Sequence, residues 1–295
     1  MSFAVSILEQ GLIYGILALG IYITYKILDF PDLTVDGSFP LGAAVTALMI
    51  TKGANPYLTL PAAFAAGVPA GICTGLIHVK CKGRDLLSGI IMMTALWTIN
   101  LRVAGTANVP LFSQKTIFKN DTLDKLLPSG FSAYSTLLII LIIALIVKII
   151  LDLYLNTKSG YLLRAVGDND KLVTAMAKDE GNVKILGLAI ANGLCSLAGC
   201  IFCQEERVFE ISSGTGAMVI GLASVIIGTS IFKKISFVKT TTAVLIGSII
   251  YKACVAIALK NFEPQDMKLI TAVLFLVILV LSMERKKKVK KNAGA

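Results

Sequence analysis

The sequence predicts an all-α, polytopic membrane protein, and two observations indicate this fold class. Hydrophobic residues make up 56% of the 295 residues and charged residues only 16%, whereas an ordinary soluble domain carries about a quarter charged residues. The charges are also bunched, so that long uncharged runs remain between them. A globular core needs no such segregation, but each helical span of a bilayer requires about 20 mainly apolar residues.

Eight apolar runs are long enough, or nearly long enough, to cross the hydrocarbon core. They are Ala4–Tyr25, Leu58–Val79, Leu86–Ala104, Ala133–Leu155, Ile185–Phe202, Ala217–Phe232, Val238–Leu259 and Met267–Leu281. A further apolar run, Leu41–Thr51, is too short to cross alone, so we expect half of a broken helix or part of a re-entrant segment. The result is a single transmembrane domain over residues 1–295, with about eight to nine transmembrane helices.

The distribution of Lys and Arg predicts the orientation of these spans. One set of connections, together with the C-terminal tail, carries 18 of these residues, and the opposite set carries seven. The positive-inside rule places the richer set in the cytoplasm. We therefore expect an external N-terminus and a basic cytoplasmic tail over residues 284–295, which anchors the topology and could also contact membrane lipid. This account of the net charge of +10 leaves no need for a nucleic-acid partner.

The N-terminal apolar run shows neither a basic n-region nor a small-residue cleavage site after it. We therefore interpret it as a membrane span and not as a removable signal peptide.

Two connections are longer than turns, one external at about residues 105–132 and one cytoplasmic at about residues 157–184. In the second, Asp168, Asn169 and Asp170 can cap a helix. Its apolar face would consist of Leu172, Val173, Ala175, Met176 and Ala177. Such a short amphipathic helix could dock into a groove of a soluble partner, or it could lie flat on the lipid interface.

The stretch DFPDLTVDGSFP, residues 29–40, places three carboxylates and two prolines between apolar runs. It could be a solvated turn, in which Asp36 or Ser38 caps the short helix and Pro40 lies in the first turn. Alternatively, it dips into the bilayer between helix halves, where its polar groups line a water-filled path.

Other polar residues in or near the spans suggest weaker hypotheses. Asn100 and Asn192 are candidates for lining a cavity. Lys148 and Asp152 are spaced to form an i,i+4 ion pair. Three cysteines near residue 200 lack the paired spacing of a metal site, so we expect them to pack as small apolar residues. An acidic cluster around Glu205 and Glu206 could pair with basic residues of an external protein or simply be solvated.

Three stretches resemble the permeases of ABC importers for branched-chain amino acids and for sugars such as ribose. GYLLRAVGDNDKLVTAMAKDEGNVKILGLAIANGLCSLAGCI, from Gly160, resembles the signature loop and the following span of that family. LEQGLIYGILALGIYITYKILDFPDLTVDGSFPLGAAV, from Leu8, resembles the first span and the broken second one. GAMVIGLASVIIGTSIF, from Gly216, resembles a later span. The resemblance implies a type II ABC importer-like fold.

This resemblance implies a coupling helix that sits in a cleft of an ATP-binding subunit, which favours partner docking over the lipid surface. Carried over by position, the coupling residues are Gly160, Arg164, Gly167, Asp168, Asn169, Leu172, Val173 and Met176. The chain contains no G-x-x-x-x-G-K-[ST] phosphate loop. ATP and Mg would therefore be used by the partner subunit, and we expect this chain to bind no cofactor or metal and to hold no catalytic residue.

The resemblance also bears on the stretch 29–40. Sugar permeases of this family have a similar Asp-Leu-Ser-x-Gly, and here the residues are Asp32-Leu33-Thr34-Val35-Asp36-Gly37. Amino-acid permeases usually have an Asn-x-x-x-Gly-Asp version, from which this sequence departs. The likeness favours a translocation path or a structural kink. The expected path residues are Asp32, Thr34, Asp36, Ser38, Asn100 and Asn192.

The function that follows is the membrane subunit of an ABC importer in a bacterial cell membrane, and not an enzyme. Its expected partners are an ATP-binding subunit, an external substrate-binding (lipo)protein and a second permease copy. The stretch 29–45 resembles a subgroup associated with amino-acid uptake, aromatic amino acids included, and a sugar or nucleoside is the alternative substrate. An ion-coupled secondary transporter is the alternative class, which the scarcity of acids within the spans disfavours, since only Asp152 lies deep and Glu9 lies near an outer end.

Overall fold

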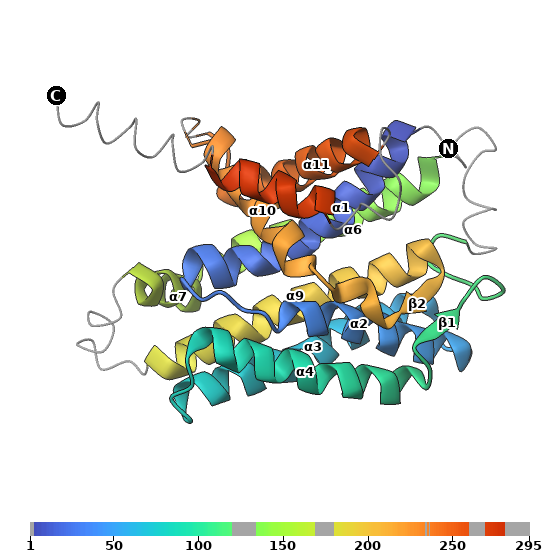
Figure 1. Cartoon of the computed structure of the whole chain (residues 1–295), viewed down its shortest axis with the longest axis horizontal. Helices are drawn as coiled ribbons and strands as arrows, with labels where there is room; N and C mark the ends of the chain where they lie inside the picture. The colour runs from blue at the N-terminus through green and yellow to red at the C-terminus, as the bar shows by residue number, and fades with distance from the viewer. Residues whose placement is uncertain are drawn as a thin grey trace.

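The computed structural model describes residues 3–119, 134–168, 180–233, 235, 237–259 and 269–280 (Figure 1). The long helices of this part of the chain are α1 (Phe3–Ile21), α3 (Thr59–Val79), α4 (Asp85–Ala104), α6 (Ser135–Leu155), α9 (Glu180–Glu206) and α11 (Thr240–Leu259). The shorter ones are α2 (Val35–Thr51), α7 (Lys158–Asp168), α10 (Ala217–Ile231) and a helix over Leu269–Val280. A π-helical segment, Tyr22–Ile27, continues α1, and 3₁₀ turns at Pro56–Leu58 and Ile211–Gly214 precede α3 and α10.

Seven helical segments of the described residues are long and apolar enough to cross a membrane: the six long helices, and α10 together with the 3₁₀ turn before it (Ile211–Ile231). They match seven of the eight predicted runs in order, and the all-α polytopic fold class is confirmed. The largest differences are at α9, which begins at Glu180 and ends at Glu206 and therefore extends beyond the predicted run at both ends. The eighth run is helical over Leu269–Val280, and its first two residues and its last lie outside the described residues.

The short helix α2 begins earlier than predicted, at Val35, and passes through Pro40 without ending. The expected capping is wrong: Thr34 is the N-cap, it makes no side-chain cap bond, and Pro40 lies in the second turn. Proline removes the backbone donor for the carbonyl of Asp36. The backbone of Gly214 fills the space beside that carbonyl, where an added Cβ would lie 2.1 Å from the oxygen.

At 1.5 Å per residue, the 17 residues of α2 span about 25 Å, less than the roughly 30 Å of a hydrocarbon core. Figure 1 shows why a short helix suffices. The chain turns back at the end of α1 and returns toward the middle of the bundle before α2 begins. This agrees with the prediction of a broken or re-entrant segment.

Helix α9 lies in the centre of the bundle, and glycine brings α2 into backbone contact with it. A Cβ on Gly42 would lie 1.7 Å from the carbonyl oxygen of Ser196, and one on Gly199 would lie 1.8 Å from that of Phe39. Small residues at such positions let helices approach closely in a membrane, where dispersion contacts and polar contacts replace the hydrophobic drive. The close approach fixes the polar side chains of the two helices against each other.

The same order of helices occurs twice in the described chain. The long helix α1 is followed by the short helix α2 and then by α3 and α4, and the long helix α9 is followed by the short helix α10 and then by α11 and the helix Leu269–Val280. Helix α1 packs against α10 and α11, where Gly221 contacts Ile21 and Gly11 contacts Ile249. The 3₁₀ turn before α10 meets the first turn of α2 inside the bundle, at Gly214 and Asp36.

The two ends of the bundle differ in structure (Figure 1). One end carries α7, and we call it the α7 end. The other carries an antiparallel ribbon of β1 (Asn108–Pro110) and β2 (Val208–Glu210), in which Val109 faces Phe209. We call this the ribbon end. The ribbon, which was not predicted, ties the long connection after α4 to the end of α9.

Exposed apolar side chains cover the outward faces of three helices. On α6 they are Leu138, Leu141, Ile142, Leu145, Ile146, Ile149, Ile150 and Leu153. Helices α4 and Leu269–Val280 carry similar faces. Exposed apolar area of this extent is typical of a surface that contacts lipid or another membrane subunit.

Candidate functional site: a buried polar network around the start of α2

The side chains predicted to line a path come to the interior of the bundle. Asp32, Thr34, Ser38, Asn100 and Asn192 are each at most 1% exposed. A solvated turn at Asp32 is therefore wrong. Burying a carboxylate is costly unless hydrogen bonds satisfy it, so its partners decide what the segment does.

Asn192 on α9 is the centre of the network. Its amide nitrogen donates to Asp32 Oδ2 at 2.7 Å and to the carbonyl of Leu188 at 3.0 Å. Its amide oxygen accepts from Ser38 Oγ at 2.6 Å. Both hydrogens of the amide are thus used, and the chain segment before α2 is fixed to the central helix.

A second branch runs from the same segment to α3. Asp32 Oδ1 accepts from the backbone N–H of Thr34 at 2.9 Å, which closes a local turn. The hydroxyl of Thr34 lies 2.8 Å from that of Thr74, and Thr74 in turn donates to the carbonyl of Ala70. Because the single hydroxyl hydrogen of Thr74 goes to Ala70, Thr34 is the donor in the pair.

Asn100 on α4 belongs to the same region but not to the Asp32 network. Its amide nitrogen donates to the carbonyl of Gly37 at 3.0 Å. Its amide oxygen is buried and has no hydrogen-bond partner in the described part of the chain. Asn100 therefore binds the first turn of α2 through its amide nitrogen, and its amide oxygen accepts no hydrogen bond from the described residues.

Asp36 performs a capping role, but for a helix 180 residues away. Its carboxylate accepts from the backbone N–H of Gly216 at 3.0 Å and from that of Met218 at 2.8 Å. Gly216 is the N-cap of α10 and has φ +84°, the left-handed region that glycine adopts without strain. The negative charge also complements the positive end of the α10 dipole. Asp36 therefore links the first turns of the two short helices.

The substitution Asp36→Ala tests this link. It leaves two N–H groups of α10 without their acceptor, and loss of an N-cap side chain costs about 0.5–2 kcal/mol. We expect uptake to fall, while insertion of the protein into the membrane stays largely intact. The measurement is uptake per inserted protein, with Asp36→Asn, which keeps one acceptor oxygen, as the milder comparison. Normal uptake by a correctly inserted Asp36→Ala protein would contradict a role in the path.

The first residues of the predicted coupling element form α7, a helix that the sequence analysis did not predict. Leu163 and Val166 are buried, whereas Arg164 is exposed. Gly160 packs on the end of α6, and a Cβ on Gly167 would lie 1.6 Å from the carbonyl of Ile27. These two glycines allow α7 to lie directly on the transmembrane helices.

Asp168 was expected to cap the start of the coupling helix, but it is the last residue of α7. The predicted coupling helix would therefore follow α7. Asn169, Leu172, Val173 and Met176 lie outside the described residues. Their role in coupling stays a prediction.

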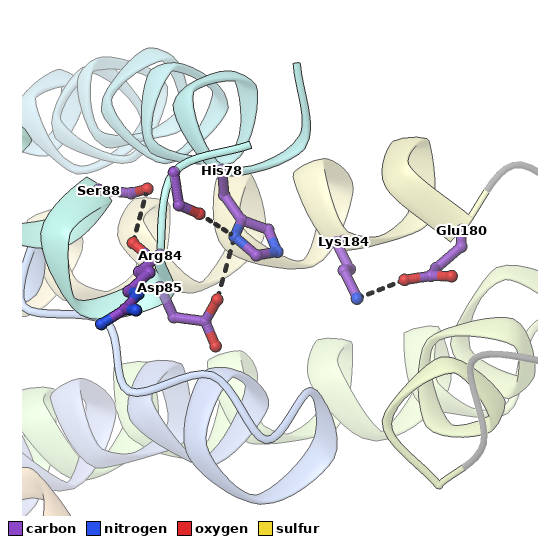
Figure 2. Close-up of polar contacts among 7 residues, drawn as sticks. His78, Arg84, Asp85, Ser88, Glu180 and Lys184 are labelled. Carbon is purple, nitrogen blue, oxygen red and sulfur yellow. Dashed lines mark hydrogen bonds and ion pairs between the residues drawn. The ribbon is translucent and has the colours of Figure 1, made fainter. Parts of the chain in front are cut away.

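Figure 2 shows the polar contacts that hold the α3–α4 connection at the α7 end. Nδ1 of His78 lies 3.0 Å from the carbonyl of Gly83 and 3.0 Å from Asp85 Oδ1. Since both neighbours are acceptors, Nδ1 carries a hydrogen. Glu180 and Lys184 form an i,i+4 ion pair in the first turns of α9. The ends of the helices that flank the connections at the α7 end are thus held by local contacts.

The acid inside α6 has a structural role. Asp152 forms the expected pair with Lys148 at 3.2 Å, and it also accepts from Thr241 at 2.6 Å and contacts Lys239 at 3.3 Å. These contacts tie α6 to α11. Among the described residues, no group of three or more His, Cys, Asp or Glu side chains could hold a metal ion.

A bundle of apolar spans with two short helices meeting at a buried polar network defines the class of multi-pass membrane transport proteins. The sequence profile of the branched-chain amino acid transport system permease component matches residues 3–283. The chain belongs to this family of ABC permeases. It is a transport subunit and not an enzyme.

Curated relatives agree with this assignment. The chain is 42% identical over 280 residues to the tyrosine transport system permease protein of Clostridioides difficile strain R20291, covering 95% of this chain and 91% of that protein. It is 31% identical over 229 residues to a probable branched-chain amino acid transport permease protein, LivH, of Methanocaldococcus jannaschii, covering 72% and 70%. It is 24% identical over 231 residues to the ribose import permease protein RbsC of Escherichia coli K12, covering 76% and 68%. No solved structure matches the chain.

Proposed function

We propose that this chain forms the translocation path of an ATP-driven importer for a small polar solute. An amino acid is the first candidate for this solute. The observation that carries the substrate class is the 42% identity, over 95% of the chain, to a relative named as a tyrosine transport permease. A sugar or nucleoside is the second candidate, because a ribose permease and a galactofuranose permease also match, at 24% and 25% identity.

The path would pass beside the contact between α2 and α10. In the structure this contact is the Asp36 cap of α10. The Asp32–Asn192–Ser38 network adjoins it and joins the start of α2 to α9. Short helices that end within the bilayer leave backbone groups and dipole ends available at its midplane, which is where transporters build sites for polar solutes. The six predicted path residues supply the polar groups for that role.

The proposed partners are two ATP-binding subunits, which use ATP and Mg, one external binding protein and a second copy of this chain. The proposed location is a bacterial plasma membrane, with the ribbon end outside and the α7 end in the cytoplasm. The excess of Lys and Arg in the connections of the α7 end and in the tail supports this orientation. The exposed apolar faces of α4 and α6 offer surface for the second copy.

One observation favours ion coupling as the other class. Glu9 on α1 is only 1% exposed, and its Oε1 has no hydrogen-bond partner in the described part of the chain. Buried acids of this kind can bind a coupling proton or ion. Asp152, the other acid within the predicted spans, is occupied by its ion pairs with Lys148 and Lys239, which weighs against the class.

Uptake by a reconstituted complex tests the proposal. The chain would be co-expressed with its ATP-binding subunit, purified, placed in liposomes and supplied with its binding protein. We expect uptake of labelled L-tyrosine that requires ATP, and a complex with two permease copies. Uptake driven by a proton or sodium gradient without ATP, uptake of ribose but not of amino acids, or a single permease copy per complex would each contradict a part of the proposal.

A further inference from the structure

A second polar cluster lies near the ribbon end, apart from the Asp32 network. It is formed by Glu9 and Gln10 on α1, Glu205 and Glu206 on α9, and Lys252 on α11. All three helices are membrane spans. Ionisable side chains within spans are rare and mark functional sites by default.

The side-chain amide of Gln10 bridges the two signs of charge. Lys252 Nζ donates to its oxygen at 3.3 Å, and its nitrogen donates to Glu206 Oε1 at 3.1 Å. Within the described residues, Lys252 forms no ion pair shorter than 4 Å with a carboxylate. The ammonium and the carboxylate are therefore held apart, with a neutral dipole between them.

Aromatic rings hold Lys252 in place. Its Nζ lies 3.6 Å from the centroid of the Tyr14 ring, within the range of a cation–π contact. Tyr14 is itself stacked on Phe39, at 5.8 Å between centroids, and meets the edge of Phe202 at 6.0 Å. An ammonium has three N–H donors, and in the described part of the chain only the Gln10 oxygen accepts from this one. Two donors of a well-positioned cation remain for another acceptor.

The carboxylates of the cluster also have unused acceptors. Oε1 of Glu9 and Oε2 of Glu205 are buried without a partner in the described part of the chain. Glu205 interacts electrostatically with the like charges of Glu206 and Glu9 and with the opposite charge of Lys252. Among the described residues, the cluster holds three carboxylates and one ammonium, and two of the carboxylates have an oxygen free to accept from a cationic group. Glu206 is exposed, so the cluster opens at the surface.

We propose that this cluster binds the zwitterionic head of an α-amino acid between Lys252 and Glu206. The Gln10 amide presents its acceptor to the ammonium and its donor to the carboxylate. A zwitterion has the same polarity with full charges, so it would displace the amide, placing its carboxylate on Lys252 and its ammonium on Glu206 and Glu205. On the proposed orientation the site faces the outside, where the binding protein releases its ligand. The inference rests on the proposed amino-acid transport and adds to it the chemical group recognised.

Binding of three probes tests this inference: L-tyrosine, and two analogues that each lack one of its two charged groups. L-tyrosine carries both charges, tyramine lacks the carboxylate, and 4-hydroxyphenylpropanoate lacks the ammonium. Binding to the full-length chain would be measured by calorimetry in nanodiscs of phosphatidylglycerol, which exclude zwitterionic headgroups that could occupy the same site. We expect tyrosine to bind at least about tenfold more tightly than either of the other two, since each lacks one charge-assisted contact.

Variants assign each contact to its residue. Lys252→Met is expected to weaken tyrosine binding by at least about tenfold and to leave tyramine binding unchanged, because tyramine has no group for Lys252. Glu206→Gln, on an exposed side chain, is expected to weaken tyrosine and spare 4-hydroxyphenylpropanoate. Lys148→Met is the matched control, since Lys148 is also a partly buried lysine in a span but pairs with Asp152. It should leave all three probes unaffected.

Several results would overturn the inference. Equal affinity for tyrosine and tyramine, or a Lys252→Met protein that loses both alike, would make Lys252 a structural residue. Absence of tyrosine binding by the wild-type chain would refute the site directly. If ATP-driven tyrosine uptake were intact and its KM unchanged in Lys252→Met, the site would be refuted while the proposed function stood. If no amino acid were taken up although ATP was hydrolysed, the proposed function would fail, whether or not the zwitterion bound.

Discussion

Replacing Asn192 with leucine is expected to lower the free energy of unfolding by about 1.5–3 kcal/mol, the range for a hydrogen bond to a charged group. The leucine side chain has the same number and branching of heavy atoms as asparagine, so the substitution leaves no cavity and removes the polar contacts. Asp32 loses the donor at 2.7 Å, and Ser38 loses its acceptor at 2.6 Å. The carboxylate is then left in an apolar interior, held only by the backbone N–H of Thr34. Uptake should fall to background.

The measurement is thermal unfolding in detergent, followed with a thiol-reactive dye. Three buried free cysteines, Cys195, Cys200 and Cys203, report the opening of the core. Ser196→Ala is the matched control, because it removes one hydrogen bond of α9, to Ala63, and should cost only about 1 kcal/mol.

A second substitution separates the lost charge partner from general disruption. In the Asn192→Leu background, Asp32→Asn replaces the unpaired carboxylate by a neutral amide of similar shape. Much of the lost stability should return, because an unpaired buried charge is more costly than an unpaired amide. If the double variant were no more stable than Asn192→Leu alone, the buried Asp32 charge would not be what the network stabilises.

The order and type of the transmembrane helices could be predicted from the sequence because each span is a local property. Apolar length and flanking charge identify α1, α3, α4, α6, α9 and α11 without reference to their neighbours. The start of α2 was less predictable. Its first two turns contain Asp36 and Pro40, which resemble a non-helical turn in isolation. Packing against Gly214 and α9 makes these residues helical.

The residues of the candidate site could be predicted from the sequence, but their hydrogen-bond partners could not. Polar side chains in an apolar chain stand out, and all six predicted path residues do come to the interior or its edge. The hydrogen-bonded residues are far apart in the sequence: Ser38 and Asn192 are separated by 154 residues, and Asp32 and Asn192 by 160. Capping rules consider only nearby residues, so the sequence suggested that Asp36 caps its own helix, α2. In the fold, Asp36 instead caps the first turn of α10.

The cluster at the ribbon end was missed for the same reason. Glu9 and Glu205 were each considered within their own segment, where a charge near a helix end is common. The bridge that Gln10 makes between Lys252 and Glu206 depends on the packing of α1 against both α9 and α11. One sequence-level signal did exist: Lys252 lies more than one turn inside its span, where snorkelling to the interface is difficult.

Introducing a carboxylate by Met176→Asp is expected to abolish substrate-stimulated ATP hydrolysis or to detach the ATP-binding subunit. Met176 lies in the predicted coupling helix, on the apolar face that it shares with Leu172 and Val173. Docking through one short helix would depend on a few buried anchors, and truncating one could cost about 2 kcal/mol, or roughly 30-fold in affinity. A buried carboxylate costs more, because it must lose its hydration without gaining a partner.

The structure adds a reason to expect that the effect stays local. Helix α7, which precedes the predicted coupling helix, is fixed to the bundle by buried Leu163 and Val166 and by the close approach of Gly167 to Ile27. A change at Met176 should therefore leave insertion and assembly of the permease intact. Met176→Leu, which keeps an apolar side chain of similar volume, is the control. The measurements are co-purification of the ATP-binding subunit and its turnover in lipid. If Met176→Asp retained both at the level of Met176→Leu, the coupling assignment would fail, and a helix lying on the lipid surface would be the better account of this segment.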